Sequence, residues 1–332
     1  MIVRSLTHPI CRSTLDELAQ FEQQFQYPLG PENHFSISHG SEYLPFFAAM
    51  GAATLLVAEH CGTIVGTLVL VHRHLVIRDS GSGESQSRCQ AAHYICDLKV
   101  RPEARSSSAL ARLLTAAADF IRPCQSHACY SVVMAGTGSE PAAYTGRLGI
   151  PDFAAVAEVA ILRFLTAPGS ALSKIVNASP DQFTATQERL RAAGVEPVAG
   201  DSFLRSLIAV PRFCHVNGTA CGLLEDTRRG KRLIHSSREE IVSSHLSRFH
   251  WSDLAAAEDL LKHALDRSFE LGFPAMFCSM PSAEWAQLKP MLQGLEYQQT
   301  SGTVYGYQVP VNLDWRIDTS EISCFVNVRS FG

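Results

Sequence analysis

The sequence predicts an α/β (α+β) protein made of two similar halves. Apolar runs of strand length alternate with amphipathic stretches of helix length along the whole chain. The stretch CGTIVGTLVL (61–70) returns as NGTACGLLED (217–226), so both halves carry the pattern xGTxxGxL. The chain has 332 residues, which is long for one domain and suitable for two. We therefore expect a duplicated domain, divided into residues 1–168 and 169–332.

In the first half, runs rich in β-branched and aromatic residues predict strands. Two of these runs flank a tight turn at Cys61-Gly62 and predict a β-hairpin. The alanines of the last run leave a helix open as the alternative there. The expected strands are 2–7, 53–60, 63–77, 93–100, 129–136 and 154–165.

Apolar residues at helical spacing predict helices between these strands. Ser13 or Thr14 is the expected N-cap of the first helix. A further helix should follow the strand 93–100 and end near residue 121. The other expected helices are 14–25, 42–50 and a short one over 141–149.

The second half follows the same order. Its segments match the hairpin, the strand after it, the long helix and the closing strand–helix–strand of the first half. The alternative is that the two halves look alike only because all alternating strands and helices resemble one another. The ordered run of matches favours duplication. The matching segments are 206–216, 231–251, 252–272, 274–281, 283–297 and 302–310.

Composition excludes several classes of protein. The net charge is −4, without the basic stripe of a nucleic-acid binder. Ten cysteines include no CxxC pair, so buried free thiols in a reducing compartment are favoured over disulfides or a zinc site. There is no apolar run of about 18 residues and no signal-peptide pattern. We expect a cytoplasmic protein that binds neither nucleic acid nor membrane.

The most informative stretch is HYICDLKVRPEARSSSALARLL (93–114). A strand passes into a helix here through Arg105 and three serines. Free N–H groups and the helix dipole make a helix N-terminus an anion site. The order of elements and the spacing of Val100, Pro102 and Arg105 resemble the GCN5-related N-acetyltransferase (GNAT) superfamily, in which this turn follows the opening strand of the cofactor site.

The resemblance implies two GNAT-like domains, each with a mixed, mostly antiparallel central sheet flanked by helices, arranged as a pseudo-dimer. It also implies acetyl-CoA or another acyl-CoA as cofactor, with its pyrophosphate held at the turn. Two glycines of the family motif are replaced here, by Ser108 and Leu110. Simple capping of the helix by the serines is the alternative. The residues implied to bind the pyrophosphate are Arg105, Ser106, Ser107, Ser108, Ala109 and Leu110.

Acyl transfer from a thioester to an amine needs a base, a donor for the oxyanion and an acid for the leaving thiolate. The resemblance implies an oxyanion donor among the backbone N–H groups of Leu98, Lys99 and Val100. Asp97 is the candidate base, with an ion-paired strand carboxylate as its alternative reading and His93 as another base. Tyr144 is the candidate acid, although it lies one residue before the family's position.

The second half lacks the R-x-x-G-x-G motif. Ser252 is expected to be the N-cap of its long helix and Asp253 to make the first turn acidic, and an acidic residue there would repel a phosphate. We therefore expect a degenerate second domain. The predicted activity is acyl transfer to a small amine-type acceptor by a monomer or homodimer. The alternative is a non-catalytic GNAT-fold module that binds CoA as a sensor or scaffold.

Overall fold

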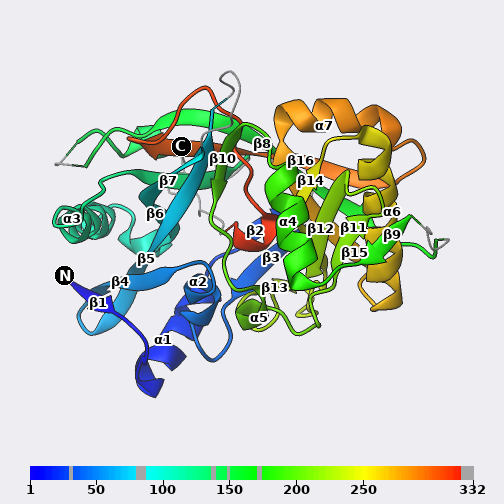
Figure 1. Ribbon diagram of the computed structural model, residues 1–332. Coiled ribbons are helices and arrows are strands. Elements are labelled where there is room, and N and C mark those ends of the chain that lie inside the picture. The colour runs from blue at the N-terminus through cyan, green and yellow to red at the C-terminus, as the bar shows by residue number, and fades with distance from the viewer. Residues whose placement is uncertain (30–32, 80–86, 136–139, 148–149, 170–173, 323–332) are drawn as a thin grey trace.

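The computed structural model describes residues 1–29, 33–79, 87–135, 140–147, 150–169 and 174–322. One large sheet runs through the molecule, and Figure 1 shows the first half of the chain on the left and the second half on the right. The first half contributes β1 (Ile2–Leu6), β4 (Ala52–His60), β5 (Thr63–Arg78), β6 (Ser87–Val100), β7 (Cys129–Met134) and β8 (Ala154–Leu165).

The second half contributes the remaining strands of the large sheet. They are β9 (Ile175–Asn177), β10 (Gly194–Pro197), β11 (Arg212–His215), β12 (Ala220–Glu225), β14 (Ser244–Trp251), β15 (Ala275–Pro281) and β16 (Tyr297–Tyr307). The strand order is β1-β4-β5-β6-β7-β16-β8-β15-β14-β12-β11-β9, with β10 paired to β5. Read from either end, this order runs through equivalent strands of the two halves, as a duplication requires.

The two halves exchange their last strands. β16 of the second half lies between β7 and β8, antiparallel to both, and β8 of the first half pairs with β15 of the second. Each half therefore completes the sheet of the other. This exchange was not predicted from the sequence. The strand prediction for 154–165 is confirmed over helix, whereas the domain boundary at residues 168 and 169 stays a prediction.

The repeated GTxxG pattern has the same structural cause in both halves. Gly62 and Gly218 form hairpin turns with φ of +76° and +66°, a region that favours glycine. Gly66 and Gly222 lie beneath the following helix. A Cβ atom at Gly66 would lie 2.9 Å from Leu113 Cδ1, and one at Gly222 would lie 3.2 Å from Leu260 Cδ2. The pattern thus marks a tight turn and a close helix–sheet contact.

Helices cover both faces of the sheet. They are α1 (Arg12–Glu22), α2 (Pro45–Ala48), α3 (Ala109–Ile121), α4 (Pro180–Leu190), α5 (Ser202–Arg205), α6 (Leu254–Glu270) and α7 (Ser282–Leu288). In the first half, α3 packs on one face through Leu113 and Ala117. α1 and α2 pack on the opposite face through residues such as Phe21 and Phe46. No helix of the described segments is long and apolar enough to cross a membrane.

Several local predictions need correction. α1 begins at Arg12, and its N-cap residue is Cys11, so neither Ser13 nor Thr14 caps it. The helix expected over 42–50 is the single turn α2. The helix expected over 141–149 is a 3₁₀ turn over Pro141–Ala143, and residues 148–149 lie outside the described segments. Short segments rich in proline and glycine lack the length that a stable α-helix needs.

A second, three-stranded sheet joins the two halves. It consists of β13 (Arg232–His235), β3 (Asn33–Ser38) and β2 (Tyr27–Leu29) in that order. The segment 231–251 was expected to continue the large sheet as the counterpart of the first hairpin. Instead β13 leaves it and pairs with β3 of the first half. Periodicity cannot show which partner a short strand takes.

Candidate active site

The site is built where two neighbouring parallel strands separate. β6 and β7 pair only at His93–Cys129 and Tyr94–Tyr130. β7 pairs with β16 along its whole length, from Cys129 to Met134, so beyond this point only its pairing with β6 is lost. The separation leaves a space between the strands beneath α3, and Leu98, whose backbone N–H is one of the implied oxyanion donors, lies beside it.

A cavity of about 190 Å³ occupies this space. Its floor comes from β6 and β7, its roof from the second half of α3, and one wall from the segment that precedes β8. Most of its lining is apolar. The lining residues are Ile95, Leu98, Leu114, Ala117, Ala118, Ile121, Arg122, His127, Cys129, Ser131, Pro141, Tyr144, Thr145, Ile150, Pro151, Phe153 and Tyr307.

Two predicted site residues, Leu98 and Tyr144, line this cavity. Leu98 reaches it because β6 has a bulge. The register passes from Val69–Cys96 to Thr67–Lys99, so β6 has one more residue than β5 in this interval. Ile95 and Leu98 therefore share the α3 face although they are three residues apart.

Tyr144 lies at the end of the 3₁₀ turn, with φ of −137°. Because this segment is not an α-helix, the one-residue offset from the family's position does not turn the side chain away from the cavity. The side chain is buried, and burial, with a smaller effect of Tyr305, raises the pKa of the Tyr144 hydroxyl. Tyr144 is therefore protonated at neutral pH, as a general acid must be.

The turn from Arg105 to Leu110 leads into α3 at the end away from the cavity's roof. Ser106, Ser107 and Ser108 are exposed, and Arg105 is half-buried. The Ser107 hydroxyl accepts a hydrogen bond from the Ala109 N–H at 3.2 Å, and so acts as a cap. The Ser108 hydroxyl accepts one from Arg112 at 3.1 Å. None of the residues from 105 to 110 lines the cavity.

Asp97 and Lys99 lie on the opposite face of the sheet, away from the cavity. Both side chains are fully buried, and Lys99 Nζ lies 2.8 Å from Asp97 Oδ1. The hydroxyl of Tyr43 donates a second hydrogen bond to this carboxylate. His93 is buried too, and burial, followed by the charge of His72, lowers its pKa to about 4. Neither Asp97 nor His93 lines the cavity.

Sequence reasoning missed two buried polar residues, one in the cavity wall and one on the opposite face of the sheet. Glu22 of α1 accepts a hydrogen bond from Lys99 Nζ at 2.9 Å and contacts His39 Nδ1 at 2.5 Å. Ser131 of β7 carries a buried hydroxyl in the cavity wall, and no partner for it occurs among the described residues. Glu22 lies at an apolar position of an amphipathic helix, and this was the one available signal.

Donor atoms of Glu22, His39 and Asp97 lie within 4.8 Å of one another, as in a metal site. The Lys99 ammonium already bridges the two carboxylates, however. A positive charge is therefore present between the acidic groups, and a second cation beside it would be repelled. The cluster does not fit a metal ion.

In the second half, Met280 and Trp285 are buried in the same hydrophobic core as Leu246 and Phe249 of β14. Asp253, one residue later than the predicted cap Ser252, is the N-cap of α6, because its carboxylate accepts a hydrogen bond from the Ala256 N–H at 2.8 Å. A carboxylate of the chain thus binds one of the free N–H groups at the start of α6.

No protein-family model matches the sequence, and a search of curated proteins finds no significant match. Solved structures do match. One is Saccharomyces cerevisiae N-myristoyltransferase with bound myristoyl-CoA, with a TM-score of 0.62 and 8% identity over 98% of this chain and 89% of that chain.

Two further structures of the same yeast enzyme agree. One, with bound myristoyl-CoA, has a TM-score of 0.61 and 8% identity over 98% of this chain and 84% of that chain. The other, with myristoyl-CoA and inhibitors, has a TM-score of 0.63 and 9% identity over 97% and 84%. The predicted fold class is confirmed: this chain has the same mixed α/β fold, with a large and mostly antiparallel sheet flanked by helices, as the N-myristoyltransferase structures.

Proposed function

We propose that the protein is an N-acyltransferase that takes an acyl group from acyl-CoA and passes it to an amine. The observation that carries this proposal is the apolar cavity between the separated strands β6 and β7, with Leu98 and Tyr144 in its wall. The yeast N-myristoyltransferase structures of the same fold hold myristoyl-CoA.

The shape of the site suits an elongated ligand with one anionic and one apolar end. The turn at Arg105 offers a positive charge and the N-terminus of α3. The cavity lies under the later turns of α3, from Leu114 to Arg122. Ala109 and Ala118 are about 14 Å apart along the helix axis, at 1.5 Å per residue. An acyl-CoA, with phosphates at one end and an acyl chain at the other, spans such a distance.

The cavity is larger than an acetyl group requires. Its 190 Å³ is well above the roughly 10–15 Å³ that a cavity needs to hold one water molecule. We therefore favour an acyl chain of several carbons over acetyl. The buried hydroxyl of Ser131 supports a ligand that also carries a polar group, because buried polar atoms in proteins nearly always have a partner.

The residues divide the chemistry as follows. The backbone N–H of Leu98, at the bulge, donates to the oxyanion that forms as the amine attacks the thioester carbon. Tyr144 gives its proton to the departing thiolate. Asp97 already accepts hydrogen bonds from Lys99 and Tyr43, so we assign it no proton transfer. The amine's proton passes to water in this scheme.

The first test is calorimetric titration with CoA, acetyl-CoA, octanoyl-CoA and myristoyl-CoA. We expect one site per chain and an affinity that rises from acetyl to octanoyl. The complex that binds best is then mixed with a panel of primary amines, and loss of the thioester absorbance is followed. No binding at millimolar ligand would refute the proposal. Binding without transfer to any amine would leave a CoA-binding module instead.

A further inference from the structure

The face of β6 opposite the cavity carries a closed group of charges. Lys99 Nζ lies 2.8 Å from Asp97 Oδ1 and 2.9 Å from Glu22 Oε1, and the three side chains are at most 2% exposed. Taking a charge out of water costs several kcal/mol even after relaxation. Charges retained in the interior therefore call for a role beyond filling space.

The charges surround the bulge of β6. Asp97 has φ of +51°, a strained value for a residue with a side chain. Its carbonyl oxygen accepts a hydrogen bond from the Thr67 hydroxyl at 3.2 Å, and its carboxylate is held by Lys99 and Tyr43. A strained residue persists only where its surroundings hold it. Here hydrogen bonds and an ion pair hold both the carbonyl oxygen and the carboxylate of Asp97.

The bulge decides which residues face the cavity. In a regular strand, alternation would place Ile95, Asp97 and Lys99 on one face and Leu98 on the other. With the extra residue, Ile95 and Leu98 both line the cavity, while Asp97 and Lys99 face α1. The position of the Leu98 backbone relative to a bound ligand therefore depends on this bulge.

The second half shows that the fold forms the bulge without these charges. β14 has one extra residue against β12 at the equivalent place, and Arg248 there has φ of +50°. Its N–H donates to Asp318 at 2.9 Å. The counterpart of Lys99 is His250, which contacts Glu196 and Gln187 at 3.3 Å. The lysine bridge belongs to the half that contains the cavity.

We propose that Lys99 and Glu22 are positioning residues, which through Asp97 hold the Leu98 N–H against the carbonyl of a bound thioester. This inference rests on the proposed function. The bridge fixes the bulge to α1, and α1 is fixed in turn through the hydrogen bond of 3.0 Å from the His39 N–H to Glu22. A donor held rigidly in place polarises a carbonyl more than a mobile one.

The test uses octanoyl-CoA labelled with ¹³C at the thioester carbonyl, and difference infrared spectroscopy of the complex. In the wild type the carbonyl band should move to lower wavenumber than in free octanoyl-CoA. In Lys99→Met at least half of that displacement should disappear, while the Kd changes less than threefold. If Lys99 were needed only for folding, its replacement would not reduce the band displacement while leaving the Kd nearly unchanged.

Lys99→Met leaves two buried carboxylates and can fail to fold. The triple variant E22Q/D97N/K99M removes all three charges together, which proteins tolerate better than loss of one partner, and it should lose the band displacement in the same way. Glu196→Gln is the matched control, since it alters the equivalent cluster of the second half, and it should keep the displacement.

The outcomes separate the two proposals. If the wild type binds octanoyl-CoA with a displaced band and the folded triple variant keeps it, the positioning role is wrong and the proposed function stands. If the wild type binds without any displacement, the Leu98 N–H does not reach the carbonyl and the inference fails. If the wild type does not bind octanoyl-CoA, the proposed function fails and this inference fails with it.

Discussion

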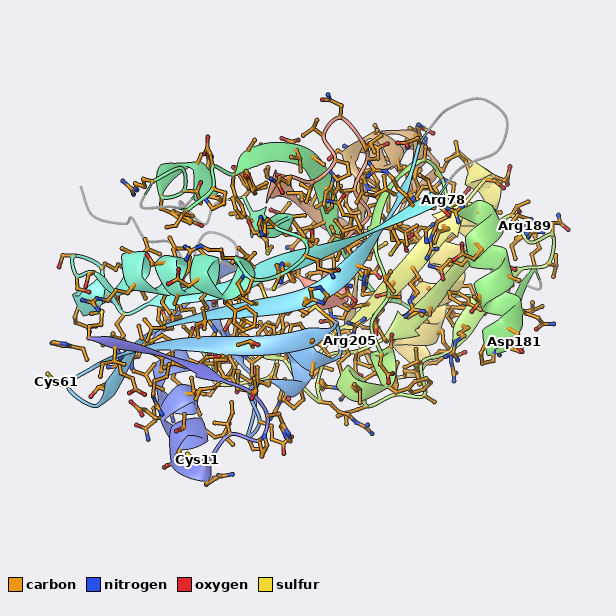
Figure 2. All side chains as sticks on the ribbon, turned by 60° about the vertical axis from the view of Figure 1, so that its left-hand side comes forward. Cys11, Cys61, Arg78, Asp181, Arg189 and Arg205 are labelled. Atoms are coloured by element: carbon orange, nitrogen blue, oxygen red, sulfur yellow. The ribbon has the colours of Figure 1, made fainter. Side chains whose placement is uncertain are left out.

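Arg73 of β5 and Glu321 near the C-terminus form a buried ion pair, with 2.9 Å between Nη1 and Oε2. The second oxygen of Glu321 lies 3.1 Å from Arg205, and Arg205 is bound by both oxygens of Glu225 in β12. None of the four side chains is more than 5% exposed. Figure 2 marks Arg205 between the two halves, which this network connects.

Glu321→Gln should lower the free energy of unfolding by about 3–5 kcal/mol, because it leaves two arginines buried without their shared carboxylate. Urea unfolding measures this. Glu270→Gln is the control, since Glu270 forms an exposed pair with Arg267 and should cost less than about 1 kcal/mol. Equal effects of the two changes would show that the network adds no stability.

The acid limit of stability should follow the buried glutamates. Burial alone would raise the pKa of Glu225, but the charge of Arg205 and their hydrogen bonds outweigh it and lower the pKa to about 2 from 4.5. A lowered pKa gives stability that is present above pH 4.5 and is lost as the pH falls toward 2. We expect the Tm to fall steeply in this interval. A Glu225→Gln variant should show a shallower fall, and an unchanged slope would contradict the assignment.

A second interdomain contact lies at the far end of β5. Arg78 Nη2 is 2.6 Å from the carboxylate of Glu188 in α4, the helix that also carries Arg189 (Figure 2). Glu188 is half exposed, so this pair should add little, and Arg78→Ala should change the free energy of unfolding by about 1 kcal/mol or less. A loss comparable with that of Glu321→Gln would show that β5 is anchored mainly at this end.

Arg105→Ala should weaken the binding of CoA by about 1–3 kcal/mol, as expected for a hydrogen bond between charged groups. The effect should shrink at high salt, since Arg105 is only half-buried. Calorimetry with CoA measures both. Arg12→Ala, which removes an exposed arginine of α1, should leave the affinity unchanged. If Arg105→Ala also has no effect, the serines serve only to begin α3.

Tyr144→Phe should lower kcat by about 100-fold, because it removes the proton for the leaving thiolate and keeps the ring in the cavity wall. The affinity for acyl-CoA should change little. Tyr307→Phe is a matched control, since Tyr307 lines the same cavity but its hydroxyl accepts a hydrogen bond from Gln308. Similar losses in both variants would mean that packing, not proton transfer, is affected.

Gly66→Ala should lower the free energy of unfolding by about 1–3 kcal/mol through overpacking. The added Cβ would lie 2.9 Å from Leu113 Cδ1 and 3.1 Å from the carbonyl oxygen of Lys99. Urea unfolding again measures the change. Gly169→Ala adds a Cβ at an ordinary 3.4 Å from Asp266 and should be nearly neutral. Equal stability of the two variants would show that α3 moves outward at little cost.

Several elements could be predicted from their residues because the signals are local. The hairpin around Gly62 and the strand ending at Val100 depend on neighbours within a few positions. The long amphipathic helix α6 was predicted for the same reason. The prediction was weakest for short elements such as α2, where tertiary packing decides whether a turn extends into a helix.

The candidate site was predicted only in part. Leu98 and Tyr144 were identified and do share one cavity. Asp97 was correctly placed on the opening strand, yet an extra residue in β6 turns it toward Glu22 and away from the cavity. Apolar residues lie on both faces of β6, so its alternation does not reveal the bulge, and the partners Glu22 and Tyr43 lie more than fifty positions away in the chain.

The sequence alone therefore determined the main strands and helices, the duplication and the turn at Arg105, since periodicity and glycines act within a few residues. Only the tertiary structure decided that β8 and β16 change places, that β13 joins β3, and that Lys99 is buried between Asp97 and Glu22. These choices depend on which distant surfaces fit together, and burial then determines which charges are retained as pairs.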